Sequence, residues 1–185
     1  MDSSWAQSLL FANLLSHAVL LTGATWCVAF PSRRIYPMER ANGWYFAMWV
    51  LFAFVFISNP LFVYLDWNTG LFPSSLRFWL AIPMVLLGAG LVAWGMATLG
   101  AKRTSGLADE LIAEGPYLLT RNPQYVGDFL IFTGVALLSN SSVVMVAHLL
   151  TALVLLLAPF AEEPWLESHY GDDYAAYRLR VPRYL

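Results

Sequence analysis

At residues 115–128 the chain reads GPYLLTRNPQYVGD, a polar stretch rich in turn-forming residues that leads into a hydrophobic hairpin. An acidic pair, Glu162-Glu163, follows the returning arm of that hairpin. If the chain reverses at residues 139–142, Arg121 and Glu162 lie nearly the same number of residues from the turn. Two antiparallel helices would then bring the Arg-Asn-Pro segment and the acidic pair to one membrane level. We therefore take their meeting point as the candidate active site.

The composition indicates an integral membrane protein of one domain. Of the 185 residues, 59% are hydrophobic and only 12% are charged, and the mean hydropathy is +0.60. A soluble domain of this size could not bury so much apolar surface. The net charge of −2 and the lack of a basic cluster give no reason to expect a nucleic-acid partner. We expect no metal site, and the single Cys27 excludes an internal disulfide.

Five apolar runs predict an all-α polytopic membrane bundle of about five transmembrane helices, followed by a cytoplasmic helical tail. The runs cover residues 9–30, 44–65, 78–100, 125–138 and 143–160. As a helix the fourth run is only about 21 Å long, shorter than the roughly 30 Å hydrocarbon core. Nine of the ten Lys and Arg residues lie in the first loop, the 101–125 loop or the tail. This asymmetry predicts an N-terminus outside and a C-terminus in the cytoplasm, and we expect a prokaryotic inner membrane.

Polar residues inside the second and first spans need an explanation. We interpret His17, in the middle of the first span, as the partner of an interhelical hydrogen bond rather than as a ligand. Ser58-Asn59-Pro60 interrupts the second span, and we interpret it as a structural kink, because proline lacks a backbone donor.

Small residues mark the third span. Gly88 and Gly95 share one helical face, and Gly90 lies off that face. Small residues allow close approach of either a neighbouring backbone or a flat ligand, and from the residues alone we favour helix packing.

The tail after Glu163 predicts two short helical segments. Pro164 suits a first helical position, Gly171 predicts a break, and Asp172 suits an N-cap. Tyr170, Tyr174 and Tyr177 are spaced to share one face, which predicts a tail that packs back beneath the bundle.

The acidic pair needs a positively charged partner. Glu162 and Glu163 are predicted to lie at a helix C-terminus, where the helix dipole disfavours anions and favours a cation. Arg121 is one candidate cation, and a cationic ligand is another. A plain salt bridge between Arg121 and the pair, closing the hairpin, explains the residues equally well.

The stretch before the fourth span offers complementary chemistry. Pro116 and Pro123 restrict the backbone, and the helix N-terminus near Pro123 presents free N–H groups to a carboxylate or phosphate. Tyr117 and Tyr125 provide aromatic faces for a purine or a cation. An adenine-containing zwitterion with a sulfonium would fit these features together with the acidic pair.

The motifs taken together resemble the isoprenylcysteine carboxyl methyltransferase family and are similar to the related membrane phospholipid methyltransferases. They are Gly115-Pro-Tyr117, Arg121-Asn-Pro-Gln-Tyr125-Val-Gly127, Glu162-Glu163, Tyr170-Gly-Asp-Asp-Tyr174-x-x-Tyr177 and Val181-Pro-Arg183. The resemblance covers roughly residues 88–185 and implies a C-terminal half, residues 76–185, that binds S-adenosyl-L-methionine. It leaves residues 1–75, the N-terminal spans, as the substrate side of the single membrane domain 1–185.

The resemblance also implies site residues. It gives catalytic roles to Arg121, Asn122 and Glu163. It assigns cofactor contacts to Gly88, Gly90, Gly115, Tyr117, Arg121, Asn122, Pro123, Tyr125, Gly127, Glu162 and Glu163. Arg121 would hold a carboxylate, and the acidic pair would receive amino or ribose groups of the cofactor.

One residue departs from the family pattern. Asn122 stands where the family usually has histidine, and asparagine cannot carry a proton at neutral pH. The departure bears on acid–base chemistry at this position more than on cofactor binding. Tyr125-Val-Gly-Asp128 also resembles a motif of membrane sterol reductases, which use NADPH, but the acidic pair and the short chain favour a methyltransferase.

The expected function is S-adenosylmethionine-dependent methyl transfer to a lipophilic small molecule that enters from the bilayer. The acceptor could be an isoprenylcysteine-like carboxylate, a lipid amine or a thiol, and membrane lipids are the other expected partners. An NADPH-dependent reductase and a non-enzymatic membrane scaffold are the alternatives.

Overall fold

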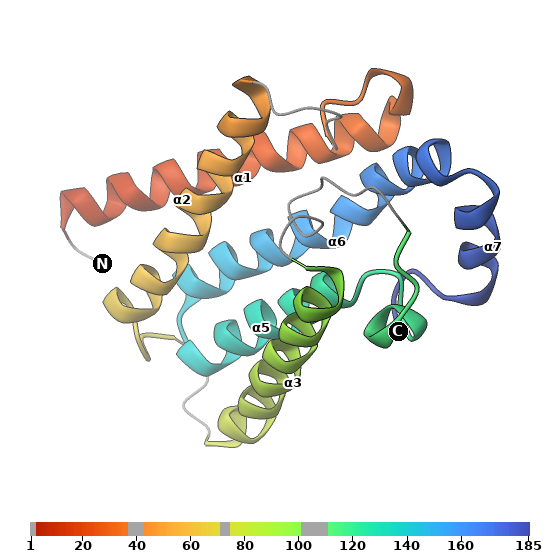
Figure 1. Cartoon of the computed structure of the whole chain (residues 1–185). Coiled ribbons are helices and arrows are strands. Elements are labelled where there is room, and N and C mark those ends of the chain that lie inside the picture. Colours follow the sequence, from red (N-terminus) through yellow and green to blue (C-terminus); the bar gives the residue numbers. More distant parts are fainter. Residues whose placement is uncertain (1–2, 37–42, 71–74, 101–110) are drawn as a thin grey trace.

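Apolar runs of this length form helices because, in lipid, backbone N–H and C=O groups find partners only inside a helix. The computed structural model describes residues 3–36, 43–70, 75–100 and 111–185, and within them all regular secondary structure is helical. Figure 1 shows long helices packed side by side, with the shorter C-terminal helix folded around one end. The predicted all-α class is confirmed.

The two N-terminal helices cross each other and rest on the long helix α6 (Figure 1). Helix α1 is Ser4–Ala29, and helix α2 is Gly43–Leu65. Between them lies the short 3-10 turn η1, Pro31–Arg33. Helix α6 is Ser142–Tyr170.

A buried polar network joins these three helices. The Nδ2 of Asn13 donates to Ser58 Oγ at 2.8 Å, and the Nδ2 of Asn59 donates to Thr151 Oγ1 at 2.8 Å. Nε2 of His17 lies 2.8 Å from the same Thr151 oxygen, so the interhelical role predicted for His17 is confirmed. Helix α2 continues through Pro60 within the predicted span 44–65, and the kink at residues 58–60 stays a prediction. Contacts to α1 and α6 hold Ser58 and Asn59 within the helix.

Helix α3, Leu76–Leu99, packs closely along helix α5, Pro123–Ser139. A Cβ on Gly88 would lie 2.5 Å from the carbonyl oxygen of Gly127, and one on Gly127 would lie 2.7 Å from that of Gly88. The two backbones therefore touch, as the helix-packing interpretation predicted. Gly90 is exposed, and no described atom lies within 4 Å of a Cβ built on it.

Helices α5 and α6 form the predicted hairpin. Asn140 ends α5 in the left-handed conformation, at φ 46°, and Ser141 caps α6 by accepting from the backbone N–H of Val144 at 3.1 Å. Helix α6 then runs ten residues beyond the predicted end of the span at Phe160. It passes through the acidic pair and Pro164, so the predicted helix end there is wrong.

The tail folds back as expected. Gly171, with φ 56°, ends α6 and precedes helix α7, Asp172–Arg180, so the N-cap lies one residue earlier than predicted. Tyr174 and Tyr177 are buried in one cluster with Val181, and Tyr170 packs against it. The shared tyrosine face is confirmed.

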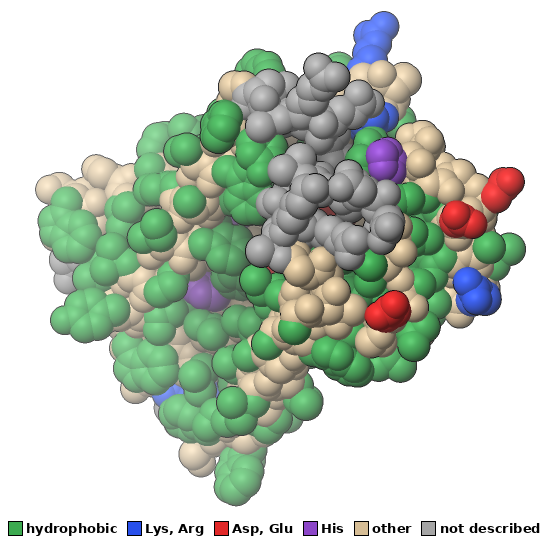
Figure 2. Space-filling model, in the orientation of Figure 1, with side chains coloured by type: hydrophobic (Ala, Val, Ile, Leu, Met, Phe, Trp, Pro, Cys, Tyr) green, Lys and Arg blue, Asp and Glu red, His purple; other side chains and the backbone are tan. Residues whose placement is uncertain are grey.

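Four of the described helices, α1, α2, α3 and α6, are long and apolar enough to cross a membrane. Helix α5, with 17 residues, is the short fourth run of the sequence prediction. On the face shown in Figure 2, hydrophobic side chains cover most of the surface, and acidic ones gather on the side of α7. Arg40, Lys102 and Arg103, three of the basic residues behind the topology prediction, lie outside the described residues.

Candidate active site

The loop that carries Arg121 is fixed to α3 through a 3-10 turn, η2, Gly115–Leu118. Gly115 has φ 53°, and a Cβ there would lie 2.8 Å from Thr98 Oγ1 and 3.1 Å from Trp94 Nε1. Both the backbone conformation and the contact with α3 therefore require glycine. Pro116 follows at the second position of the turn, where a missing N–H does no harm.

The end of the chain holds this loop from the other side. The N–H of Arg121 donates to the carbonyl of Pro182 at 2.9 Å. The carbonyl of Arg183 accepts from Thr120 Oγ1 at 2.9 Å and from Asn122 Nδ2 at 3.1 Å. Asn122 thus acts here as a neutral donor to backbone, a role that needs no titratable proton.

Three charged side chains meet at α6. Nη2 of Arg121 lies 2.9 Å from Glu163 Oε1. Arg183 contacts both carboxylate oxygens, with Nε at 2.7 Å from Oε1 and Nη2 at 2.6 Å from Oε2. The side chains of Arg121 and Glu163 are only 7% and 6% exposed. This ion cluster contains two cations and one anion, so it carries an excess positive charge.

Buried donors in and beside the ion cluster have no partner among the described residues. They are Nε and Nη1 of Arg121 and the hydroxyl of Tyr174. Burial is the main cause that raises the pKa of Tyr174, and the negative charge of Glu163 is the second. The hydroxyl of Tyr174 therefore keeps its proton at neutral pH. An unpaired buried donor costs about 1–3 kcal/mol. An anionic ligand with at least two acceptor atoms would remove this penalty.

Glu162 faces a different environment from Glu163, because neighbouring residues on a helix point about 100° apart. Its Oε1 accepts from the hydroxyl of Tyr36 at 2.5 Å and from the hydroxyl of Tyr125. Burial is the main cause that raises the pKa of Tyr36 well above its usual value, and the charge of Glu162 is the second. Helix α6 continues to Tyr170, so the acidic pair does not lie at a helix C-terminus, and the dipole effect predicted for it is wrong.

Tyr117 and Pro123 are held close to the same loop. The carbonyl of Tyr117 accepts from Tyr177 Oη at 2.6 Å. The hydroxyl of Tyr117 accepts from Gln124 Nε2 at 3.3 Å. Burial raises the pKa of Tyr117 to about 12. Pro123 is buried as the first residue of α5.

The structure therefore brings together most of the predicted site residues around the loop and the acidic pair. Gly88 and Gly127 lie instead in the α3–α5 interface, where backbone contact accounts for them without a ligand. Three residues of the site, Arg183, Tyr174 and Tyr36, had no site role predicted from the sequence. The Val181-Pro-Arg183 and Tyr170–Tyr177 motifs were the signals for the first two, and no motif marked Tyr36. Within the described residues, no group of three or more His, Cys, Asp or Glu could hold a metal ion.

Fold and site together define a polytopic helical membrane protein with a buried Arg121 and a half-buried Arg183 where its loop, tail and α6 meet. The family model for phospholipid methyltransferases matches residues 76–173, just over half of the chain. The protein belongs to that family. Comparisons with curated proteins and with solved structures gave no match. Helices α1 and α2, and the tail from Tyr174 onward, lie outside the matched region.

Proposed function

We propose that the protein transfers a methyl group from S-adenosyl-L-methionine to a lipophilic substrate within the membrane. The observation that carries the proposal is the pair of unpartnered, buried donors on Arg121. Both belong to a charged guanidinium, and such donors make stronger hydrogen bonds to a carboxylate than neutral donors do. The excess positive charge of the ion cluster favours the same ligand group, and family membership supports methyl transfer as the reaction class.

The residues of the site fit this cofactor. Arg121 would hold its carboxylate, with the hydroxyl of Tyr174 as a further donor nearby. Glu163 is already bound by two arginines, so its main contribution would be to fix the orientation of the Arg121 guanidinium. Contacts of Gly90, Tyr117, Tyr125 and the acidic pair with the cofactor stay predictions.

The cofactor supplies a methyl group that its sulfonium makes electrophilic. The chain then needs chiefly to position the two reactants and to exclude water. Burial of the Arg121–Glu163 pair and of the tail tyrosines serves both needs. Asn122 binds a backbone carbonyl, so no proton transfer is proposed at this position.

Two alternatives remain distinguishable by experiment. A scaffold needs only the salt bridge, and that bridge leaves two donors of Arg121 unused, which favours a ligand. An NADPH-dependent reductase would also bring anions to the arginines. The topology that we propose, with the C-terminus in the cytoplasm of a prokaryotic cell, opens the site to either cofactor.

Incubation of the purified protein with methyl-labelled S-adenosylmethionine and a membrane lipid extract tests the proposal. Label should move into the lipid fraction, and Arg121→Gln should abolish most of the transfer. Arg178→Gln is the matched control, because Arg178 is 44% exposed and pairs only with Glu167 among the described residues. Oxidation of NADPH without any methyl transfer would overturn the proposal.

A further inference from the structure

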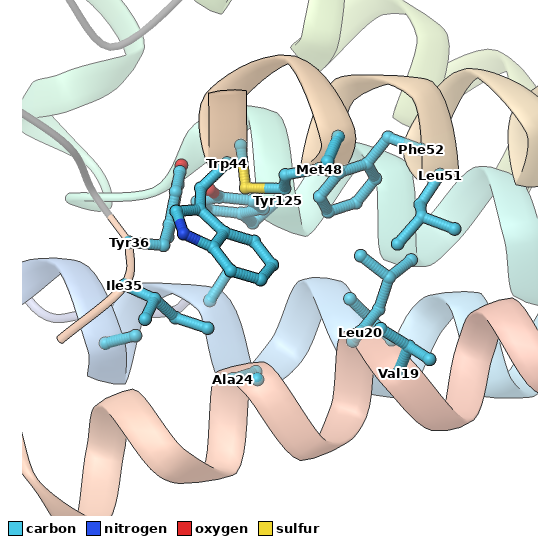
Figure 3. Close-up of a pocket in the computed structure, with 15 residues that line it drawn as sticks. Val19, Leu20, Ala24, Ile35, Tyr36, Trp44, Met48, Leu51, Phe52 and Tyr125 are labelled. Carbon is cyan, nitrogen blue, oxygen red and sulfur yellow. The ribbon is translucent and has the colours of Figure 1, made fainter. Parts of the chain in front are cut away.

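An apolar pocket of about 160 Å³ lies between α1, α2, α5 and α6 (Figure 3). Most of its wall comes from helices outside the region that matches the family. The wall includes Leu20 and Ala24 of α1, Met48 and Phe52 of α2, and Val154 and Ala158 of α6.

The pocket opens toward the surface that the helices present to lipid. Val19, Ile35 and Trp44 line it and are 50%, 49% and 73% exposed. Leu20 and Val154, by contrast, are buried in one core cluster. A hydrocarbon chain could therefore enter sideways from the bilayer without crossing a polar surface.

Two tyrosines form the polar end of the pocket. Tyr36 and Tyr125 both line it, and both hydroxyls donate to Oε1 of Glu162. A phenol has one proton to donate, so each of these oxygens can act toward the pocket only as an acceptor. The polar end therefore suits a group that donates hydrogen bonds, because the two phenols offer no donor to an anionic head group.

The tyrosine end also lies next to the candidate cofactor site. Glu162 and Glu163 are adjacent on α6, one contacting the two tyrosines and the other the two arginines. A molecule in the pocket would thus place its head group at the boundary between the two environments.

We propose that this pocket binds one hydrocarbon chain or ring of the methyl-accepting substrate, with a hydrogen-bond-donating head group such as an amine at Tyr36 and Tyr125. The inference rests on the proposed function for the role of the occupant. The volume supports one ring or a segment of a single chain, since an apolar cavity of about 150 Å³ holds a molecule the size of benzene. Two acyl chains side by side would not fit.

Photolabelling in lipid nanodiscs tests this proposal. The probe is hexadecylamine with a diazirine on its chain, compared with the matching fatty acid and with a two-chain phosphatidylcholine that carries the same diazirine. The amine should label residues 19–24 and 44–52 above the level of other lipid-facing segments, and the other two probes should not. Equal labelling by the two-chain lipid, stronger labelling by the fatty acid, or uniform labelling of all helices would overturn the proposal.

Variants sharpen the test. Ala24→Phe should reduce labelling of the pocket roughly tenfold. The added ring would fill part of the pocket, and forcing the probe into the remaining space should weaken its binding by about that factor. Ala93→Phe, at an exposed position of α3, is the matched control and should change nothing. Tyr36→Phe should reduce the preference for the amine over the acid, while a purely structural role of Tyr36 would lower the labelling by both.

Binding of S-adenosylhomocysteine, measured by calorimetry on the same samples, separates the two proposals. Ala24→Phe should leave this binding unchanged. Pocket labelling without any binding of S-adenosylhomocysteine would overturn the proposed function and leave the pocket as a site for single chains. Binding of S-adenosylhomocysteine without pocket labelling would overturn the pocket and leave the proposed function.

Discussion

At the scale of single residues, Glu163 sets the charge balance of the candidate site. Its carboxylate accepts from Arg121 and, through both oxygens, from Arg183. Arg183 also lies over the ring of Phe160, 3.9 Å from its centroid. Removing the carboxylate would leave two guanidinium groups facing each other, one of them almost fully buried.

We predict that Glu163→Gln lowers the free energy of unfolding by about 3 kcal/mol, because breaking a buried ion pair leaves an uncompensated charge. Glu167→Gln on the same helix is the control. Its partner is Arg178, both side chains are 44% exposed, and the expected loss is below about 1 kcal/mol. Denaturant unfolding in detergent measures both losses. Similar values for the two variants would show that the ion cluster is not a stabilising feature.

The sequence predicted part of this site, and chain distance explains the limit. Arg121 and the acidic pair could be brought together because they lie at similar distances from one turn. The contact of Tyr36 with Glu162 spans 126 residues. No periodicity or turn relates those two segments, so only the packing of α1 and α2 on α6 determines it.

At the scale of helices, the α3–α5 interface depends on glycine. Gly88 and Gly127 allow the two backbones to touch, and Gly134 adds a third close approach, with Val85 Cγ2 at 2.8 Å from its ideal Cβ. This interface positions the N-terminus of α5, and with it the loop that carries Arg121.

We predict that Gly88→Ala destabilises the protein by about 1–3 kcal/mol, because a Cβ 2.5 Å from the Gly127 carbonyl must push the helices apart. Gly90→Ala should be neutral or stabilising by up to about 1 kcal/mol, since alanine favours a helix and no described atom lies nearby. Thermal unfolding compares the two. If Gly90→Ala instead weakens S-adenosylhomocysteine binding at unchanged stability, then Gly90 contacts the cofactor as the family resemblance implies.

The end of α6 shows why a local rule can fail. Proline is typical of the first position of a helix, yet α6 continues through Pro164 for six more residues. A proline inside a helix removes one backbone hydrogen bond. Here Glu163 and Trp165 are buried on either side of it, and their tertiary contacts keep the helix intact.

At the scale of the whole molecule, the apolar helices and the positions of the basic residues predict the orientation in the membrane. Five crossings, the number that we predict, would place the two ends of the chain on opposite sides. Nine of ten basic residues then lie on the side of the C-terminus, with only Arg77 on the other.

Reporter fusions test this orientation. A reporter at the C-terminus should be active in the cytoplasm, and one at the N-terminus should be active outside. Both ends on the same side would mean that α5, which is only 17 residues long, does not cross the bilayer.

The fold class and the hairpin followed from composition, run length and turn residues. The sequence pattern did not predict the angle at which α2 crosses α1 or the pocket that results. Both depend on a polar network of Asn13, Asn59 and Thr151 from three separate helices. Hydropathy identifies such helices but does not say which faces meet.

The central claim is that Arg121 holds the carboxylate of the cofactor. The most direct measurement is calorimetry of two ligands, S-adenosylhomocysteine and 5′-methylthioadenosine, which lacks the amino-acid part. Arg121→Gln should weaken S-adenosylhomocysteine binding by roughly 10- to 150-fold, the equivalent of a hydrogen bond to a charged group, and leave 5′-methylthioadenosine binding unchanged. Unchanged 5′-methylthioadenosine binding also shows that the variant is folded. Equal effects on both ligands, or no binding of S-adenosylhomocysteine to the wild-type protein at millimolar concentration, would contradict the claim.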